Sequence, residues 1–147
     1  TEAKKRYSLT LVDLFENILN QIKAYDREIA LLVEQHPYSS IFLSLPGVQY
    51  NLGSRLLGEI GDNLSQYKDY NSLQSYAGTA PVSFFSGKLR KTVRRRKACN
   101  KHLRDTLHLM AFSSLMKSKW ARGFYLEQKN KGKPHNHALR SVANKWV

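Results

Sequence analysis

The stretch SIFLSLPGVQYNLGSRLLGEIGD, Ser40 to Asp62, joins two apolar helical segments through one tight turn. The first segment is predicted to end at Leu45, and a proline followed by a glycine is typical of a turn, here at Pro46, Gly47 and Val48. Between Asn51 and Ile60 the leucines recur at helical spacing, which predicts a second helix. This outline predicts a mainly α-helical domain that contains a helix-hairpin-helix-like element.

Turns of this kind bind a sugar-phosphate chain, because glycine lets the backbone approach closely and the amides at the second helix's N-terminus bind a phosphate. The usual form has a second glycine two positions after the first, where this sequence has Gln49. Two interpretations therefore remain open for Pro46, Gly47 and Val48: a phosphate-binding turn, or a structural connection between two helices.

A long helix is expected on the N-terminal side, from about Leu9 to Glu34, with Ser8 capping its start and His36-Pro37 ending it. Its apolar residues are spaced alternately by four and three, which is the heptad seam of a coiled coil. Further apolar residues widen the stripe, so the spacing is compatible with pairing to a second copy, with pairing to a partner helix, or with packing inside the domain. The seam consists of Leu11, Phe15, Ile18, Ile22, Tyr25, Ile29 and Leu32.

We divide the chain into a linker helix, residues 1–38, and a compact helical domain, residues 39–147. The second part begins with the hairpin above and continues through a short helix that carries Leu73 and Tyr76, broken at Gly78 and Pro81. Later elements are an extended segment from Val82 to Phe85, a turn at Ser86-Gly87, and helices from Asn100, from about Lys119 to Gln128, and from near Asn136.

The charge of the chain is concentrated in its second part. Residues 1–87 carry seven Lys/Arg and nine Asp/Glu, whereas residues 88–147 carry seventeen and two. Such an excess indicates a polyanion partner, with nucleic acid favoured over a solvated face or a membrane surface because aromatic residues are interleaved with the basic ones. The predicted nucleic-acid-binding residues are Arg90, Arg94, Arg95, Arg96, Lys97, Asn100, Lys101, Arg104, Lys131 and Lys133.

Several classes of protein and site are disfavoured. No apolar run approaches the roughly 20 residues needed to cross a bilayer, and TEAKKRY does not resemble a signal peptide, so we expect a cytoplasmic protein without a membrane partner. The single Cys99 cannot form an internal disulfide or a zinc site. His135 and His137 are expected in a loop without acidic partners, so no metal site is predicted in this chain.

Four segments, taken together, carry a resemblance to a known family. In order they are LPGVQYNLGSRLLGEIGD, LQSYAGTAPVSFFSG, RRRKACNKHLRDTLHLMA and FYLEQKNKGK. Their order and spacing from about Leu45 to Val147 resemble the C-terminal domain of the insertion-sequence-one-ten-type transposases, also called DEDD transposases. The preceding helix is similar to the coiled-coil linker of those proteins. The resemblance implies a domain that supplies a nucleophilic serine for DNA strand cleavage and exchange.

The family's motif residues map onto this sequence one by one. Its Ser-Gly pair falls on Ser86 and Gly87, and its asparagine followed by Leu-Arg falls on Asn100, Leu103 and Arg104. The preceding basic tract falls on residues 94–97, and a small residue before the asparagine is here Cys99. The resemblance therefore implies that Ser86 is the catalytic residue, activated by a base and assisted by arginines that stabilise charge on the attacked phosphate.

The resemblance also implies partners outside this chain. Members of this family act as dimers or tetramers on double-stranded DNA, guided by a structured bridge RNA, and an N-terminal domain with four acidic residues holds the divalent metal, expected to be Mg²⁺. We expect oligomerisation through the Leu11–Leu32 helix, and we expect the isolated chain to bind nucleic acid but to cleave poorly. The alternative is a non-catalytic module for nucleic-acid binding and dimerisation.

Overall fold

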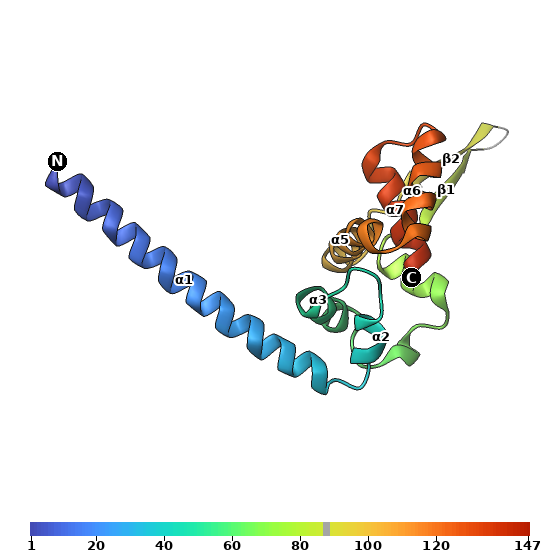
Figure 1. Ribbon diagram of the computed structural model, residues 1–147. Coiled ribbons are helices and arrows are strands. Elements are labelled where there is room, and N and C mark those ends of the chain that lie inside the picture. The colour runs from blue at the N-terminus through green and yellow to red at the C-terminus, as the bar shows by residue number, and fades with distance from the viewer. Residues whose placement is uncertain (87–88) are drawn as a thin grey trace.

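The computed structural model describes the backbone of residues 1–86 and 89–147 and the side chains of residues 1–84 and 93–147. Its described part is mainly helical with one small antiparallel sheet, as predicted (Figure 1). The elements in chain order are α1 (Glu2–Gln35), α2 (Ser39–Leu43), α3 (Tyr50–Ile60), the 3₁₀ helix η1 (Leu64–Gln66), α4 (Tyr70–Tyr76), β1 (Pro81–Ser86), β2 (Leu89–Arg95), α5 (Lys101–Lys117), α6 (Lys119–Asn130) and α7 (His135–Trp146). Within that part, no helix combines the length and apolar content that crossing a bilayer requires.

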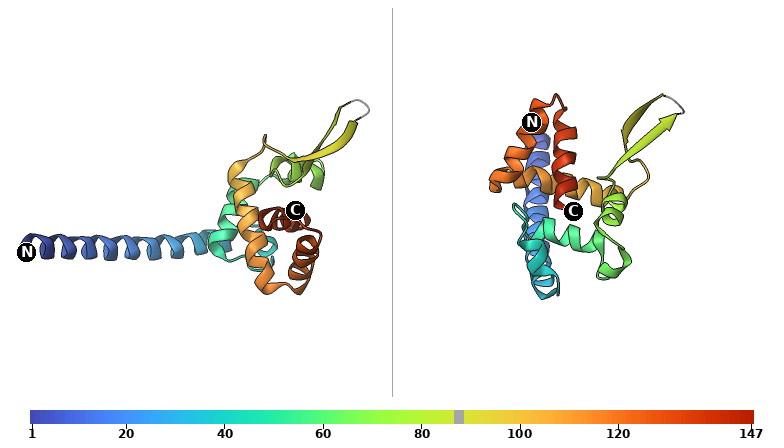
Figure 2. Two further views of the ribbon diagram at one scale, coloured as in Figure 1. Left: turned by 90° about the horizontal axis from the view of Figure 1, so that it is seen from above. Right: turned by 90° about the vertical axis from the view of Figure 1, so that its right-hand side faces the viewer.

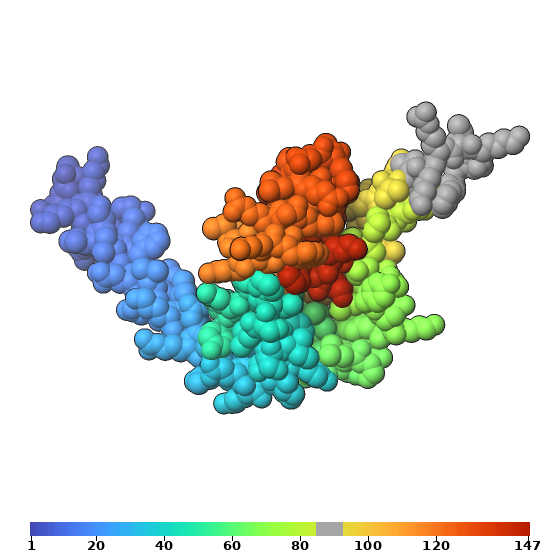
Figure 3. All heavy atoms as spheres, turned by 45° about the vertical axis from the view of Figure 1, so that its right-hand side comes forward, coloured from blue at the N-terminus to red at the C-terminus, as the bar shows by residue number. Residues whose placement is uncertain are grey.

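Helix α1 extends away from the rest of the molecule (Figures 1 and 2), and the space-filling view shows the same projection (Figure 3). The predicted seam is confirmed as a helical stripe but is not covered by the domain: Phe15 is 65% exposed and Ile18 is 53% exposed. Only the C-terminal part of the helix packs on α2 and α3, where Val33 is buried and Ile29 is partly buried.

The start of α1 differs from the expected one. The helix begins at Glu2, and Ser8 lies inside it, where its hydroxyl donates to the Lys4 carbonyl at 3.0 Å. Ser8 is therefore not the N-cap, because the preceding residues EAKKR are mostly good helix formers that extend the helix by two turns. The predicted end is confirmed, since His36 caps the C-terminus in an extended conformation.

The turn between α2 and α3 forms where Pro46, Gly47 and Val48 were expected. The Val48 amide donates to the Leu45 carbonyl at 3.1 Å, and Gly47 has φ of 82°, which makes it the third residue of a type II turn. A Cβ at Gly47 would lie 2.7 Å from the Ser113 carbonyl carbon and oxygen in α5. The glycine thus allows contact with the protein's own backbone, which favours the structural interpretation of this turn.

The core lies where α3, α5, α6 and α7 meet. Leu56, Leu103, Met110 and Val142 are almost fully buried, and each such side chain contributes about 1.5–3 kcal/mol by its removal from water. The buried Ser114 hydroxyl accepts a hydrogen bond from the Trp146 indole at 3.1 Å, which ties the end of α7 to α5.

Strands β1 and β2 form an antiparallel hairpin that extends from the helices (Figures 1 and 2). The extended segment from Val82 to Phe85 is confirmed as β1, whereas the sequence analysis did not predict that the basic run would pair with it as β2. Pro81 pairs with Arg95 at the base of the hairpin, and Ser86 pairs with Leu89 at its distal end. Gly87 lies outside the described residues.

Candidate nucleic-acid interface

The base of the hairpin is held by contacts between segments that are distant in sequence. The backbone amide of Asn100 donates to the Tyr76 carbonyl at 2.8 Å, which brings the segment before β1 next to the segment after β2. Gly78 has φ of 69°, and a Cβ there would lie 2.5 Å from the Cys99 sulfur. Only glycine fits this close approach. Gly78 therefore positions the start of β1 against the segment that follows the end of β2.

Asn100 is also the N-cap of α5. Its side-chain oxygen accepts from the Leu103 amide at 3.1 Å, while its side-chain nitrogen donates to Glu59 at 2.7 Å and to the Tyr76 hydroxyl at 2.9 Å. The structure therefore gives Asn100 a structural role at the junction of α3, α4 and α5. Glu59 is part of this junction.

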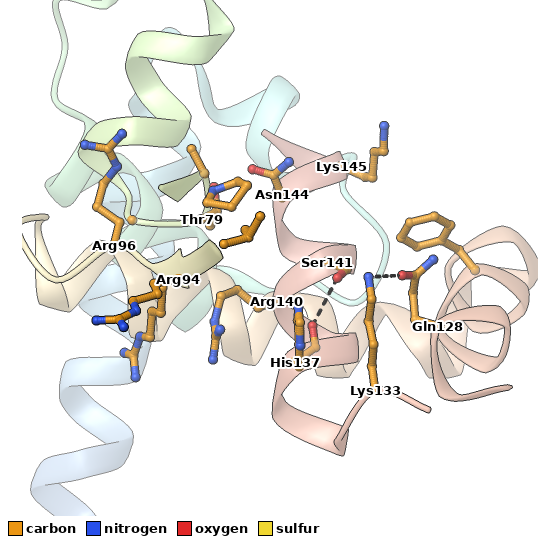
Figure 4. A pocket seen from close by; sticks show the side chains of 16 residues that line it. Thr79, Arg94, Arg96, Gln128, Lys133, His137, Arg140, Ser141, Asn144 and Lys145 are labelled. Carbon is orange, nitrogen blue, oxygen red and sulfur yellow. Dashed lines mark hydrogen bonds between the residues drawn. The ribbon is translucent and has the colours of Figure 1, made fainter. Parts of the chain in front are cut away.

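A cavity of about 470 Å³ opens between the base of the hairpin and helices α6 and α7 (Figure 4). Among the residues that the structure describes, its lining contains no Asp or Glu, and Phe124 supplies an aromatic ring at one side. Figure 4 shows the side chains of Arg94, Arg140 and His137 among those that line the cavity. The cationic residues that line the cavity are Arg94, Arg95, Arg96, Lys133, Arg140 and Lys145. Cations gathered without carboxylates form an anion-binding surface.

Burial and neighbouring positive charges lower the pKa of two residues that line the cavity. Burial, together with the nearby Arg95 and Arg104, lowers the pKa of the Arg140 guanidinium. Burial, together with Lys133 and Arg140, likewise lowers the pKa of His137. The lowered pKa values mean that the site disfavours the positively charged forms of Arg140 and His137. A bound anion would favour the charged forms and raise both pKa values.

Two lining groups have unused hydrogen-bonding capacity. The buried Nε of Arg96 and the buried side-chain oxygen of Asn144 have no hydrogen-bond partner among the described residues. Buried polar atoms are usually paired, so each of these atoms is available to a ligand or an ordered water. One is a donor and the other an acceptor, so together they suit a ligand that offers both an acceptor and a donor.

The structure brings some of the predicted residues together and separates others. Arg94, Arg95, Arg96 and Lys133 line the cavity, whereas Arg104 binds Asp105 and Lys131 forms an ion pair with Glu127. Lys97 and Lys101 are exposed beside the N-terminus of α5. The side chains of Ser86 and Arg90 lie outside the described residues.

Ser86 lies at the end of the hairpin opposite to Arg94, Arg95 and Arg96. It is five residues beyond Pro81, and antiparallel strands rise about 3.4 Å per residue, so its backbone lies about 17 Å from the level of Arg95. That separation exceeds the reach of one arginine side chain. Arg94, Arg95 and Arg96 are thus near Ser86 in sequence but lie at the opposite end of the hairpin.

Sequence reasoning missed the contribution of α7. His137, Arg140 and Lys145 line the cavity, while Leu139 and Val142 on the other side of the helix are buried. The expectation that His135 and His137 lie in a loop was wrong, because α7 begins at His135. Polar residues at 133, 137, 140, 141 and 144 have helical spacing opposite an apolar stripe, and this was the available signal.

Comparison with known proteins identifies the family of the chain. The model of the family described as Transposase IS116/IS110/IS902 matches residues 39–126, which is more than half of the chain. The chain belongs to this transposase family.

Relatives in insertion elements extend the match. The IS117 mini-circle protein of Streptomyces coelicolor is 38% identical over 113 residues, which are 77% of this chain and 27% of the relative. The IS116 protein of Streptomyces clavuligerus is 33% identical over 147 residues, which cover 98% of this chain and 37% of the relative. The IS110 protein of Streptomyces coelicolor is 32% identical over 127 residues, which cover 86% of this chain and 31% of the relative. The chain thus spans about a third of the length of these transposase-family relatives.

The matched segment of the transposase family supplies only half of the cavity. It includes Arg94, Arg95 and Arg96 at the end of β2, whereas Lys133 and Arg140 follow residue 126. The cationic surface of this family member is therefore assembled from the matched segment and from the helix that follows it.

Proposed function

We propose that this chain is the nucleic-acid-binding, serine-bearing part of a transposase, in which Ser86 attacks a DNA phosphodiester. The observation that carries the proposal is the geometry of the hairpin. Ser86 lies at the distal end of a projecting two-stranded ribbon, and a cationic cavity without carboxylates lies at its base. A two-stranded ribbon fits the major groove of B-DNA, so the cavity can hold the backbone while the ribbon brings Ser86 to the duplex.

The proposed reaction is a phosphoryl exchange. The Ser86 hydroxyl oxygen attacks phosphorus and its proton passes to a base. The bond between phosphorus and a deoxyribose oxygen breaks, and that oxygen takes a proton from an acid or from water and leaves as a hydroxyl group. The product is a phosphoserine ester, which retains the energy of the broken bond. A second strand's hydroxyl then displaces the serine, and the strands are joined without ATP. Guanidinium groups that bind the phosphate oxygens would stabilise the increasing charge, and Arg94, Arg95 and Arg96 could do so only in a conformation that brings them closer to Ser86.

The divalent metal implied by the family resemblance is assigned to another part of the protein. Among the described residues there is no group of three His, Cys, Asp or Glu side chains placed to hold a metal ion. The acidic N-terminal domain, with Mg²⁺, would complete the active site around Ser86. Double-stranded DNA and a structured guide RNA are the proposed partners, since both present the phosphates that the cationic surface requires.

The second candidate is a non-catalytic binding and dimerisation module. The observation that favours it is the separation of about 17 Å between Ser86 and the arginines at the hairpin's base, which leaves those arginines unable to assist Ser86 in this conformation. In that case the chain would hold nucleic acid while the chemistry took place elsewhere in the full-length transposase.

Substitution of Ser86 separates the two candidates. In the full-length protein with element DNA and guide RNA, Ser86→Ala should abolish strand exchange and the covalent protein–DNA adduct while binding persists. Ser83→Ala, at an exposed position of the same strand, is the matched control and should leave both unchanged. Strand exchange that survives Ser86→Ala would establish the binding module instead.

A further inference from the structure

A second, smaller cavity of about 200 Å³ lies beside the large one. Thr79 at the entry to β1, Arg95 at the end of β2, Arg104 and His108 from α5, and Arg140 from α7 surround it. Since a water molecule occupies about 30 Å³ of liquid, this volume accommodates one phosphate group with a few waters. Segments from three parts of the chain converge here, so the cavity is produced by the fold and not by one local run of charge.

The charges around this cavity do not balance. Arg104 donates to Asp105 through Nε at 2.9 Å and lies 2.8 Å from the same carboxylate oxygen through Nη2. Asp105 is the single carboxylate in the lining, and among the described residues neither Arg95 nor Arg140 has an acidic partner within ion-pair distance. Three guanidinium groups thus face one carboxylate. Like charges this close are unfavourable until an anion joins them.

We propose that this small cavity binds one backbone phosphate of DNA, held by Arg140 and Arg95, at a point separate from the phosphate that Ser86 attacks. The inference rests on the proposed function for the identity of the ligand. Arg95 and Arg140 line both cavities, and the inference assigns to them one phosphate that is distinct from the phosphate at Ser86. The guanidinium fork of Arg140 can engage two phosphate oxygens at once, which makes arginine better suited to this role than lysine.

The register of the hairpin sets the distance between the two phosphates. Arg95 lies at the level of Pro81, and Ser86 lies five residues farther along β1. Along the hairpin, the backbone levels of the clamp and of Ser86 are therefore about 17 Å apart. With an axial rise of about 3.4 Å per base pair, a hairpin lying along the duplex would place the clamp about five base pairs from the cleavage point.

The test uses the 147-residue chain and a 12-base-pair DNA duplex, with affinity measured between about 50 and 200 mM salt. Arg140→Gln should weaken binding about tenfold or more and reduce the slope of log affinity against log salt by about 0.9, as expected for one lost phosphate contact. Arg122→Gln is the matched control, because Arg122 is exposed on α6 and lines neither cavity. Arg140→Lys should leave the slope of log affinity against log salt unchanged, because the positive charge remains. Its affinity should be lower, because lysine cannot bind two phosphate oxygens as the guanidinium group does.

Each outcome decides the matter. If wild type binds the duplex and Arg140→Gln behaves like Arg122→Gln, the clamp is wrong and the proposed function stands. If the wild-type chain binds no nucleic acid, the clamp and the proposed function are both wrong. A loss confined to an RNA duplex of the same sequence would overturn the assignment to DNA. If circular dichroism shows that Arg140→Gln does not fold, the arginine Nε–Hε NMR resonances of the wild-type chain provide the test. A shift of the Arg140 resonance on addition of the duplex supports the clamp. An unchanged Arg140 resonance, together with backbone resonances that do shift, overturns it.

Discussion

The side-chain nitrogen of Asn100 donates to the Glu59 carboxylate at 2.7 Å, and this bond joins the N-terminus of α5 to the end of α3. The two residues are 41 positions apart, and Asn100 simultaneously caps α5 through Leu103. One side chain therefore fixes the helix start, the hairpin's exit and the packing of α3.

Asn100→Ala should lower the free energy of unfolding by about 2–4 kcal/mol, because it removes an N-cap and a hydrogen bond to a charged acceptor. Asn100→Asp should retain the cap yet place a second carboxylate against Glu59. Chemical denaturation of both variants checks this, with Glu59→Gln added to Asn100→Asp to relieve the repulsion. Nearly unchanged stability of Asn100→Ala would mean that the junction contributes little.

Gly47→Ala and Gly58→Ala should change stability in opposite directions. Gly47 has positive φ and its Cβ position lies 2.7 Å from Ser113 backbone atoms, so alanine there should cost at least about 1–3 kcal/mol in strain. Gly58 is exposed within α3 with nothing within 4 Å, so alanine should stabilise the helix by about 0.5–1 kcal/mol. Thermal unfolding of the two variants measures the contrast. Equal effects of both substitutions would contradict the close approach between the turn and α5.

Acidification should destabilise the unliganded chain through His108. Burial, with Arg140 and His135 nearby, lowers the pKa of His108 in the folded protein, although Asn136 and Asp105 act in the opposite direction. The unfolded chain, with a histidine pKa of about 6.5, therefore binds its proton first, and stability falls as the pH decreases through about 6.5 toward the folded pKa.

The measurement is the melting temperature between about pH 8 and pH 5. His108→Gln should flatten the decline, whereas His102→Gln, on the exposed side of the same helix, should leave it as in wild type. A decline of the same steepness in His108→Gln would assign it to other groups, of which His137 is the first to test, because its pKa is lowered in the same direction.

The parts of the fold that could be predicted from sequence are those whose signal is local. The heptad spacing predicts α1, and proline with glycine predicts the α2–α3 turn, since periodicity and turn chemistry act over a few residues. Strand β2 could not be predicted in this way. Its run of basic residues has no apolar alternation, and it is extended because β1 pairs with it.

The candidate site shows the same limit. The basic tract at residues 94–96 predicts a cationic surface, but its partner Arg140 is 45 positions away from Arg95 and reaches it only when α7 packs on α5. The same tract is close to Ser86 in sequence and about 17 Å away along the strand. Proximity along the chain is thus a poor guide to which arginines act on the same phosphate.

The exposed stripe of α1 should pair with another helix, and we expect a second copy of the chain as the partner. Its seven seam residues keep heptad spacing over three heptads, and those before Ile29 are exposed to solvent. A stripe of this length is too apolar to remain in water without a partner. Ile18→Glu should convert the dimer to monomer in sedimentation velocity, since it places a carboxylate in the seam of both chains.

Asn20→Glu is the control, because it adds the same charge on the face opposite the seam and should leave the dimer intact. Neither substitution touches the core of residues 39–147, so circular dichroism should show unchanged thermal unfolding of that domain. If wild type sediments as a monomer at high concentration, the stripe is not a homodimer seam. A different partner helix would then have to cover it, and a dimer that survives Ile18→Glu would place the interface elsewhere on the chain.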